Sequence, residues 1–286
     1  MLVYCTTCTA RRLIFTKIES LMPAPELDRL VANVTTSRKY RQIAPALVRN
    51  LGAQELARRR NFKEAVKATK NKLHQIAAVY QEGAFAYEQW YNTLQEAPDR
   101  AGLRAACAAI MAYHASTRER LPILDTFYTT LFTGLPPITS ILDLACGLNP
   151  LAIPWMPLGG NVRYFAYDIY QDQIDFLNRC FPLLSVQGRA QVCDLLQCHP
   201  PQRADVALLL KTIPCLEQVE NGVGRRLLDR VDTPVVIVSF PVHSLSGHEK
   251  GMLDHYERYF YELVAGRPWQ INRYVFATEL AFRIRR

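Results

Sequence analysis

Strand-like and helical segments alternate along the second half of the 286-residue chain, and this alternation limits the possible folds more than any other feature. Five short apolar runs have the composition of buried strands: SILDLA (140–145), VRYFAYDI (162–169), RAQVCDLL (189–196), DVALLLK (205–211) and PVVIVSF (234–240). Two segments between them repeat apolar residues at helical spacing: YQDQIDFLNRCF (170–181) and NGVGRRLLDRV (221–231). This order predicts an α/β fold with a mostly parallel, doubly wound sheet. The last segment, WQINRYVFATELAFRIRR (269–286), predicts a hairpin at one edge of that sheet.

The first part of the chain has a helical pattern instead. Apolar residues recur at helical spacing over residues 25–112, and the prolines of PPITS (136–140) separate this region from the strands. We therefore expect a helical domain over residues 25–112 and an α/β domain over residues 113–286. Residues 1–24 are expected to form an N-terminal extension of uncertain role. One helix, in APALVRNLG (44–52), is expected to begin near its proline and to end at Gly52.

Positive charge is concentrated in one segment. The whole chain carries a net charge of +8, yet residues 38–72 contain eleven basic residues and only two acidic ones, so the remainder is nearly neutral. A localised basic patch is typical of proteins that bind polyanions, whereas a solvated helix face, the alternative, usually mixes both signs. The patch therefore predicts contacts with RNA phosphates, for which the candidates are Arg38, Lys39, Arg41, Arg58, Arg59, Arg60, Lys67 and Lys70.

The cysteines and the apolar runs indicate the compartment. Among the eight cysteines, only Cys5 and Cys8 have the spacing of metal ligands, and no second pair completes a zinc site, so we expect no metal. Scattered buried thiols are the better interpretation. No apolar run approaches the roughly 20 residues that span a bilayer, and the first residues lack the pattern of a signal peptide. These features predict a cytoplasmic protein.

The residues that end the expected strands favour a nucleoside ligand. In a doubly wound sheet, ligands bind at the carboxyl ends of the strands. The first strand ends in a tight turn that contains Ala145 and Gly147, and the second and third end in Asp168 and Asp194. A carboxylate can accept both hydroxyls of a ribose. No glycine-rich loop follows to hold a pyrophosphate, and the chain continues with Asn149 instead. This combination predicts a nucleoside cofactor without phosphates, for which S-adenosylmethionine is the obvious candidate.

Several motifs resemble one family, the aminoglycoside-resistance methyltransferases that modify N7 of guanine 1405 in 16S rRNA. The matching stretches are SRKYRQIAP (37–45), HASTRER (114–120), DLACGLNPLAIPWM (143–156), YDI (167–169), CDLL (193–196), LLLKTIPCLEQ (208–218) and SFPVHSLSGHEKGM (239–252). They cover most of the chain from about residue 25 onward, and the first 24 residues do not match the family pattern. The resemblance implies a class I, Rossmann-like methyltransferase that acts as a monomer on the 30S subunit and flips the target base out of its stack.

The resemblance also implies roles for individual residues. Arg120 is expected to hold the methionine carboxylate of the cofactor, Asp168 to hold the ribose, and Asp194 to lie at the adenine edge. The other expected cofactor contacts are Ala145, Gly147, Ile169, Leu195, Leu210 and Gln218. For both acids the alternative is an ordinary helix N-cap after a strand.

The expected chemistry needs few catalytic groups. The N7 atom of guanine has an in-plane lone pair, so no proton has to be removed, and positioning supplies most of the rate enhancement. The chain lacks the (Asp/Asn)-Pro-Pro-(Tyr/Phe) motif of amino-group methylation, and Cys215 is a poor candidate for a catalytic cysteine. Lys211 is a candidate contact to the target base, and a salt bridge to a neighbouring acid is its alternative. The target pocket is expected to include Ser239, Phe240, His243 and Ser244, of which Phe240 is equally compatible with the core.

Two other functions remain compatible with the sequence. One is methylation of another rRNA position or of a small molecule, and the other is a non-catalytic ribosome-binding protein with a vestigial nucleoside pocket. The basic segment disfavours a small-molecule substrate, because such a substrate has no need of it. The combination of Arg120, Asp168 and Asp194 disfavours a protein that only binds ribosomes.

Overall fold

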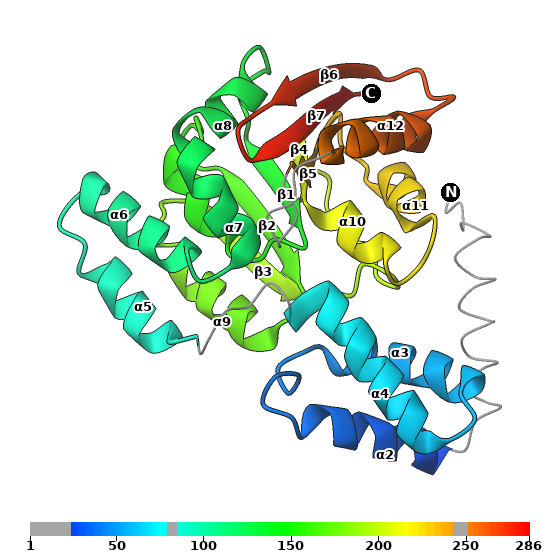
Figure 1. Cartoon of the computed structure of the whole chain (residues 1–286). Helices are drawn as coiled ribbons and strands as arrows, with labels where there is room; N and C mark the ends of the chain where they lie inside the picture. Colours follow the sequence, from blue (N-terminus) through cyan, green and yellow to red (C-terminus); the bar gives the residue numbers. More distant parts are fainter. Residues whose placement is uncertain (1–23, 79–84, 243–250) are drawn as a thin grey trace, which may run out of the picture. The chain divides into compact units, whose positions relative to one another are not determined.

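The computed structural model describes residues 24–78, 85–242 and 251–286 (Figure 1). The chain forms two compact units, Met1–Ala78 and Val79–Arg286, here called the N-terminal unit and the sheet unit. No helix in these described ranges is long and apolar enough to cross a membrane.

The N-terminal unit is helical over its described residues. Its elements are α2 (Ala24–Thr35), α3 (Pro45–Arg58), α4 (Phe62–Leu73) and the π-helical turn η1 (His74–Ala78). The expected end of α3 at Gly52 was wrong, because the helix continues to Arg58. Gly52 is buried, and a Cβ atom there would lie 2.5 Å from the Leu30 side chain. This glycine therefore allows α2 to pack closely against α3 and does not end the helix.

Four α-helices and a short 3₁₀ turn precede the sheet in the sheet unit: α5 (Tyr87–Gln95), α6 (Arg100–Met111), α7 (Ala115–Arg120), η2 (Leu121–Ile123) and α8 (Leu124–Phe132). Asp99 caps α6 by accepting a hydrogen bond of 2.7 Å from the backbone N–H of Gly102. Buried residues of α5 and α6, such as Trp90 and Ile110, belong to the same apolar core as the sheet. The two compact units thus divide before α5, whereas the sequence placed a boundary after residue 112.

Seven strands form one sheet in the order β3-β2-β1-β4-β5-β7-β6, which confirms the predicted α/β class. The parallel strands are β1 (Ser140–Leu144), β2 (Arg163–Asp168), β3 (Gln187–Val192), β4 (Val206–Leu210) and β5 (Val235–Pro241). The predicted hairpin at the edge is confirmed, since β7 (Glu279–Arg285) pairs antiparallel with β5 and with the edge strand β6 (Gln270–Val275). Strand β3 ends before Asp194, because the Asp194 carbonyl accepts the N–H groups of Gln197 and Cys198 in a tight turn.

Helices cover both faces of the sheet and leave the carboxyl ends of its parallel strands at one edge (Figure 1). One face carries the helix that follows β2, with α5 packed outside it, and the other face carries the helices that follow β4 and β5. The helices that connect the strands are η3 (Asn149–Trp155) after β1, α9 (Gln171–Cys180) after β2, α10 (Thr212–Glu217) and α11 (Val223–Arg230) after β4, and α12 (Met252–Val264) after β5. Strands β1 and β4 are buried along their whole length, as central strands of a doubly wound sheet should be.

Candidate functional site

The turn after β1 has a backbone conformation that favours glycine. Ala145 and Gly147 both have positive φ angles, +53° and +52°. The Cys146 N–H donates to the Tyr167 carbonyl at 2.9 Å and so fixes the turn against β2. A Cβ atom on Gly147 would lie 2.7 Å from the imidazole of His114, which packs over the turn. Glycine at 147 is therefore required both by its φ angle and by this close contact.

Asp168 lies directly beside this turn. Its Oδ2 accepts the N–H of Gly147 at 2.8 Å, and its Oδ1 accepts the N–H of Ile169 at 2.7 Å. Burial raises the pKa of Asp168, and hydrogen bonds from the backbone N–H groups of Gly147, Ile169 and Tyr170 and from the Gln173 side chain oppose that effect. The N-cap alternative does not hold, because Tyr170 occupies the N-cap position of α9. The Asp168 side chain is half-buried, so part of the carboxylate remains accessible to a ligand.

The predicted adenine edge is assembled from the ends of β2 and β3. Asp194 is buried, and its Oδ1 accepts the N–H of Leu196 at 3.0 Å, so it does not cap a described helix either. Leu195 is buried beside it, and Ile169 is half-buried at the end of β2. The contact of Asp194 with adenine stays a prediction.

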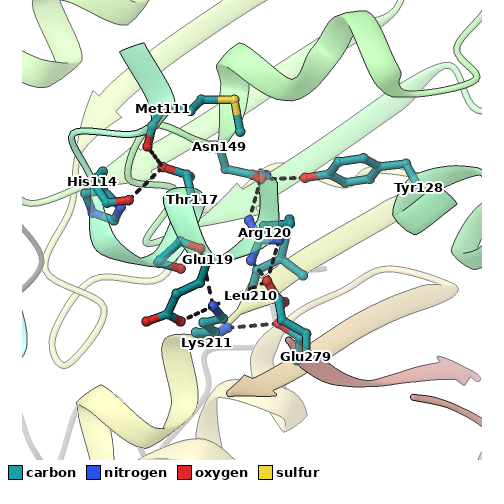
Figure 2. Close-up of polar contacts among 12 residues, drawn as sticks. Met111, His114, Thr117, Glu119, Arg120, Tyr128, Asn149, Leu210, Lys211 and Glu279 are labelled. Atoms are coloured by element: carbon teal, nitrogen blue, oxygen red, sulfur yellow. Dashed lines mark hydrogen bonds and ion pairs between the residues drawn. The ribbon is translucent and has the colours of Figure 1, made fainter. Parts of the chain in front are cut away.

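Arg120 belongs to a buried charge cluster that the sequence did not predict (Figure 2). The cluster consists of Glu119, Arg120, Lys211 and Glu279. Arg120 is 1% exposed, and its Nε and Nη2 bind the two carboxylate oxygens of Glu279 at 2.8 and 3.1 Å. Its Nη1 donates to the Asn149 amide oxygen at 2.9 Å, and its Nε contacts Glu279 as an ion pair without a hydrogen bond. Binding of a cofactor carboxylate by Arg120 stays a prediction.

Lys211 directly follows β4 and has a left-handed backbone conformation, with φ +58°. Its Nζ lies 2.6 Å from Glu119 Oε2 and 3.4 Å from Glu279 Oε1, and it donates to the Ser116 carbonyl at 3.3 Å. The salt bridge that was the alternative interpretation of Lys211 is therefore present. Burial alone would raise the pKa of Glu279, but the charges of Arg120 and Lys211 outweigh it and hold that pKa low.

Asn149 stands where a glycine-rich loop would continue, and its side chain links three other buried residues. Its amide oxygen accepts from Arg120 and from the Tyr128 hydroxyl, and its Nδ2 donates to Asp143 Oδ2 at 2.9 Å. The Tyr164 hydroxyl donates to the same Asp143 oxygen at 2.7 Å. Burial raises the pKa of Asp143 to about 6, although these hydrogen bonds oppose it. The Asp143 carboxylate is thus directed at buried residues of the protein and not at a ligand.

His114 was missed as an individual site residue, although it begins a motif that the sequence analysis quoted. Burial and the nearby charges of Arg120, Lys211 and Arg118 lower its pKa to about 3. The imidazole that packs on Gly147 is therefore neutral at pH 7.

The remaining predicted site residues have different environments. Leu210 is buried at the end of β4, whereas Gln218 is exposed at the C-cap of α10. Ser239 is buried, and its hydroxyl donates to Glu279 at 2.7 Å, which makes it part of the support of the charge cluster. Phe240 is fully buried and stacks on Tyr256 with a centroid distance of 5.1 Å, so it is core and not pocket wall.

Two candidates for the target pocket, His243 and Ser244, lie outside the described residues. The poor catalytic candidate, Cys215, donates its thiol to the Lys211 carbonyl at 3.1 Å.

All predicted RNA contacts belong to the N-terminal unit and are here together called the basic surface: Arg38, Lys39, Arg41, Arg58, Arg59, Arg60, Lys67 and Lys70. All of these residues are exposed except Lys70, which is half-buried. Arg59 also has a structural role, because its Nε lies 2.8 Å from Glu55, a carboxylate with no solvent exposure. Lys72 binds the same carboxylate at 2.7 Å. Arg59 is therefore exposed like Arg58 and Arg60, and it also neutralises a buried carboxylate.

Comparison with known proteins identifies the family. The profile of the ribosomal RNA methyltransferase (FmrO) family matches residues 36–283. The chain belongs to this family. A 16S rRNA (guanine(1405)-N(7))-methyltransferase of Frankia casuarinae is 41% identical, over 91% of this chain and 94% of its own length. The enzyme of the same name from Micromonospora echinospora is 38% identical, over 92% and 98%.

Solved structures agree with this assignment. The 16S rRNA methyltransferase RmtF, in complex with S-adenosyl-L-homocysteine, has a TM-score of 0.79 and is 30% identical, with 93% of this chain and 99% of that chain covered. The 16S rRNA methylase RmtB has a TM-score of 0.75 at 27% identity, over 91% and 98%. A glycine turn with no room for a side chain, next to a half-buried carboxylate, fits the nucleoside part of S-adenosyl-L-homocysteine.

Proposed function

We propose that this chain transfers a methyl group from S-adenosyl-L-methionine to N7 of guanine 1405 in 16S rRNA. The observation that carries the proposal is the match to enzymes of that name over about nine-tenths of the chain. The turn at Gly147, with the carboxylate of Asp168 beside it, is compatible with the cofactor of such an enzyme. The biological outcome proposed is resistance to aminoglycosides.

The cofactor is proposed to lie across the carboxyl ends of β1, β2 and β4. Asp168 accepts hydrogen bonds from the ribose hydroxyls, which its place beside the turn and its partial exposure support. Arg120 binds the methionine carboxylate with the N–H groups that Glu279 and Asn149 do not use. The other proposed contacts are Ala145, Gly147, Ile169, Asp194, Leu195, Leu210 and Gln218.

The reaction needs orientation more than proton transfer. When bound, the cofactor supplies an electrophilic methyl group. Because N7 attacks with its own lone pair, this chain needs no general base, and its residues bind and orient the two reactants. Lys211 is proposed to contact the target nucleotide, and Glu119 and Glu279 hold its ammonium group in place for this role. The neutral imidazole of His114 keeps the turn closed without adding a positive charge near the cationic methyl donor.

The substrate is proposed to be the assembled 30S subunit, bound by a monomer in the cytoplasm. The basic surface of the N-terminal unit supports this, since exposed arginines and lysines read the geometry of phosphates and not the base sequence.

Primer extension tests the proposal. We expect 30S subunits treated with the protein and S-adenosylmethionine, then reduced, to give a reverse-transcription stop at guanine 1405. Untreated subunits and subunits treated with the Asp168→Asn variant should give none. A stop at another nucleotide, or methylation of naked 16S rRNA in preference to subunits, would overturn the assigned position or the assigned substrate form.

A further inference from the structure

A buried hydroxyl on α5 has no hydrogen-bond partner in the part of the chain that the structure describes. This hydroxyl is Tyr87 Oη, which is shielded from solvent. Most buried polar groups in proteins are hydrogen-bonded, because a buried donor without an acceptor loses the bonds that water would give it. The exception at Tyr87 calls for a physical reason.

Packing on three sides fixes the ring that carries this hydroxyl. The Tyr87 ring lies edge-on against Phe85 and Trp90, each with a centroid distance of 5.5 Å. It is tilted against Phe176 of α9 at 5.0 Å. Phenylalanine at position 87 would make the same ring contacts, so the packing explains the ring but not its hydroxyl.

Two carboxylates, one at the end of β2 and one in the first turn of α9, affect the pKa of this hydroxyl. Burial raises the pKa of Tyr87 well above its ordinary value, and the carboxylates of Asp172 and Asp168 raise it further. The phenol therefore stays protonated and remains a donor. The oxygens of Asp168 accept hydrogen bonds from Gly147 and Ile169, and not from Tyr87.

We propose that Tyr87 Oη donates a hydrogen bond to a ribose hydroxyl of the cofactor. A ribose hydroxyl is both a donor and an acceptor, so it can donate to Asp168 and accept from Tyr87 at the same time. The cofactor thereby supplies the acceptor that the protein does not. This inference rests on the proposed role of Asp168 as the ribose acceptor, and it makes Tyr87 a cofactor-binding residue from outside the sheet.

Calorimetry with S-adenosylhomocysteine tests the contact on the full-length protein. Tyr87→Phe should weaken binding roughly 3- to 10-fold, the usual worth of one neutral hydrogen bond. The unfolding temperature of the free variant should be unchanged or higher, because the substitution removes an unsatisfied buried group. The matched control is Tyr91→Phe, one turn further along α5, where the ring lies 4.1 Å from the Arg179 guanidinium carbon. The control should bind within twofold of the wild type, and equal affinities of all three proteins would overturn the proposal.

Cofactor analogues identify the atom that accepts the bond. The 2′-deoxy and 3′-deoxy analogues of S-adenosylhomocysteine each lack one ribose hydroxyl. The analogue that lacks the accepting hydroxyl should bind equally well to Tyr87→Phe and to the wild type, because neither protein can form the hydrogen bond with it. A loss of the same size with both analogues would overturn the ribose contact. The variant Asp168→Asn distinguishes failure of the Tyr87 contact from failure of the ribose site. If Asp168→Asn weakens binding and Tyr87→Phe does not, only the role of Tyr87 is wrong. If neither variant weakens binding, the ribose site itself is wrong.

Discussion

Two groups of charged residues in this protein have opposite environments. In the buried charge cluster of the sheet unit, every charge lies within 4 Å of an opposite one, and Arg120 and Glu279 are almost completely buried. On the basic surface of the N-terminal unit, by contrast, nearly all side chains are exposed. Buried charges need partners because desolvation is costly, whereas exposed ones are screened and contribute little to folding. The comparison teaches that the cluster fixes the shape of a site, while the surface is available for a polyanion.

The largest effect should come from breaking the cluster. Glu279→Gln removes the carboxylate that pairs with both Arg120 and Lys211, and uncompensated buried charge should lower the free energy of unfolding by about 3–5 kcal/mol. The control is Glu257→Gln, whose partially exposed pair with Arg273 should cost less than about 1 kcal/mol. Urea unfolding measures both. Equal losses would mean that burial does not distinguish the two pairs.

Charge reversals on the basic surface should lower the affinity for the 30S subunit instead of the stability of the fold. The double variant Arg58→Glu/Arg60→Glu should weaken 30S binding roughly 10-fold or more, and it should lower the slope of log affinity against log salt by roughly two. A double reversal at exposed arginines of the sheet unit, Arg100→Glu/Arg163→Glu, changes the net charge equally and should have a smaller effect. Filter binding at two salt concentrations measures this. Equal weakening by both doubles would show that net charge, and not this surface, controls docking.

Arg59 combines features of both groups of charges, because it is exposed and yet pairs with a buried carboxylate. Arg59→Glu places a second carboxylate one turn from the buried Glu55, so it should destabilise the protein by about 1 kcal/mol. Arg60 lies beyond the C-terminal end of α3 and is exposed, so Arg60→Glu should change stability by less than about 0.5 kcal/mol. Thermal unfolding of the two single variants, at equal ionic strength, distinguishes them. If the two variants unfold at the same temperature, Arg59 belongs functionally with the rest of the surface.

The effect that is smallest at pH 7 is a pH dependence that comes from His114, which lies near the charges of the cluster. The folded-state pKa of His114 is about 3, against an ordinary value of 6.5. Between these values the unfolded chain binds a proton that the folded chain does not, so stability is complete above pH 6.5 and falls as the pH is lowered. The slope from one such group is at most about 1.4 kcal/mol per pH unit.

His114→Gln should remove this component, which unfolding at pH 7, 6 and 5 would reveal as a flatter profile. Asp143 acts in the opposite direction, because its raised pKa of about 6 makes stability fall as the pH rises toward that value. Asp143 is present in both proteins, so the difference between the profiles isolates His114. Parallel profiles would contradict a buried neutral imidazole.

Local sequence patterns determined much of the fold. Apolar runs bounded by polar residues located the strands of the sheet, and the small-residue turn at Ala145–Gly147 marked the place where β1 ends. Asp168 was placed beside that turn because parallel strands end at a common edge. The pattern was less informative at Gly52, where a residue that often ends helices instead allows two of them to touch. Periodicity is set by neighbours in the sequence, so it predicts elements better than their contacts.

Only the tertiary structure decided which side chains meet. Arg120 and Glu279 are 159 residues apart in the sequence, and no local pattern relates a helix before the sheet to its last strand. The same holds for His114 on Gly147 and for Tyr87, whose ring packs on Phe176 of α9. These contacts depend on how the helices pack against the sheet, and that packing follows from burial of apolar surface over the whole unit. The sequence by itself determined the type of ligand, and the packing decided which charged groups are already paired before any ligand binds.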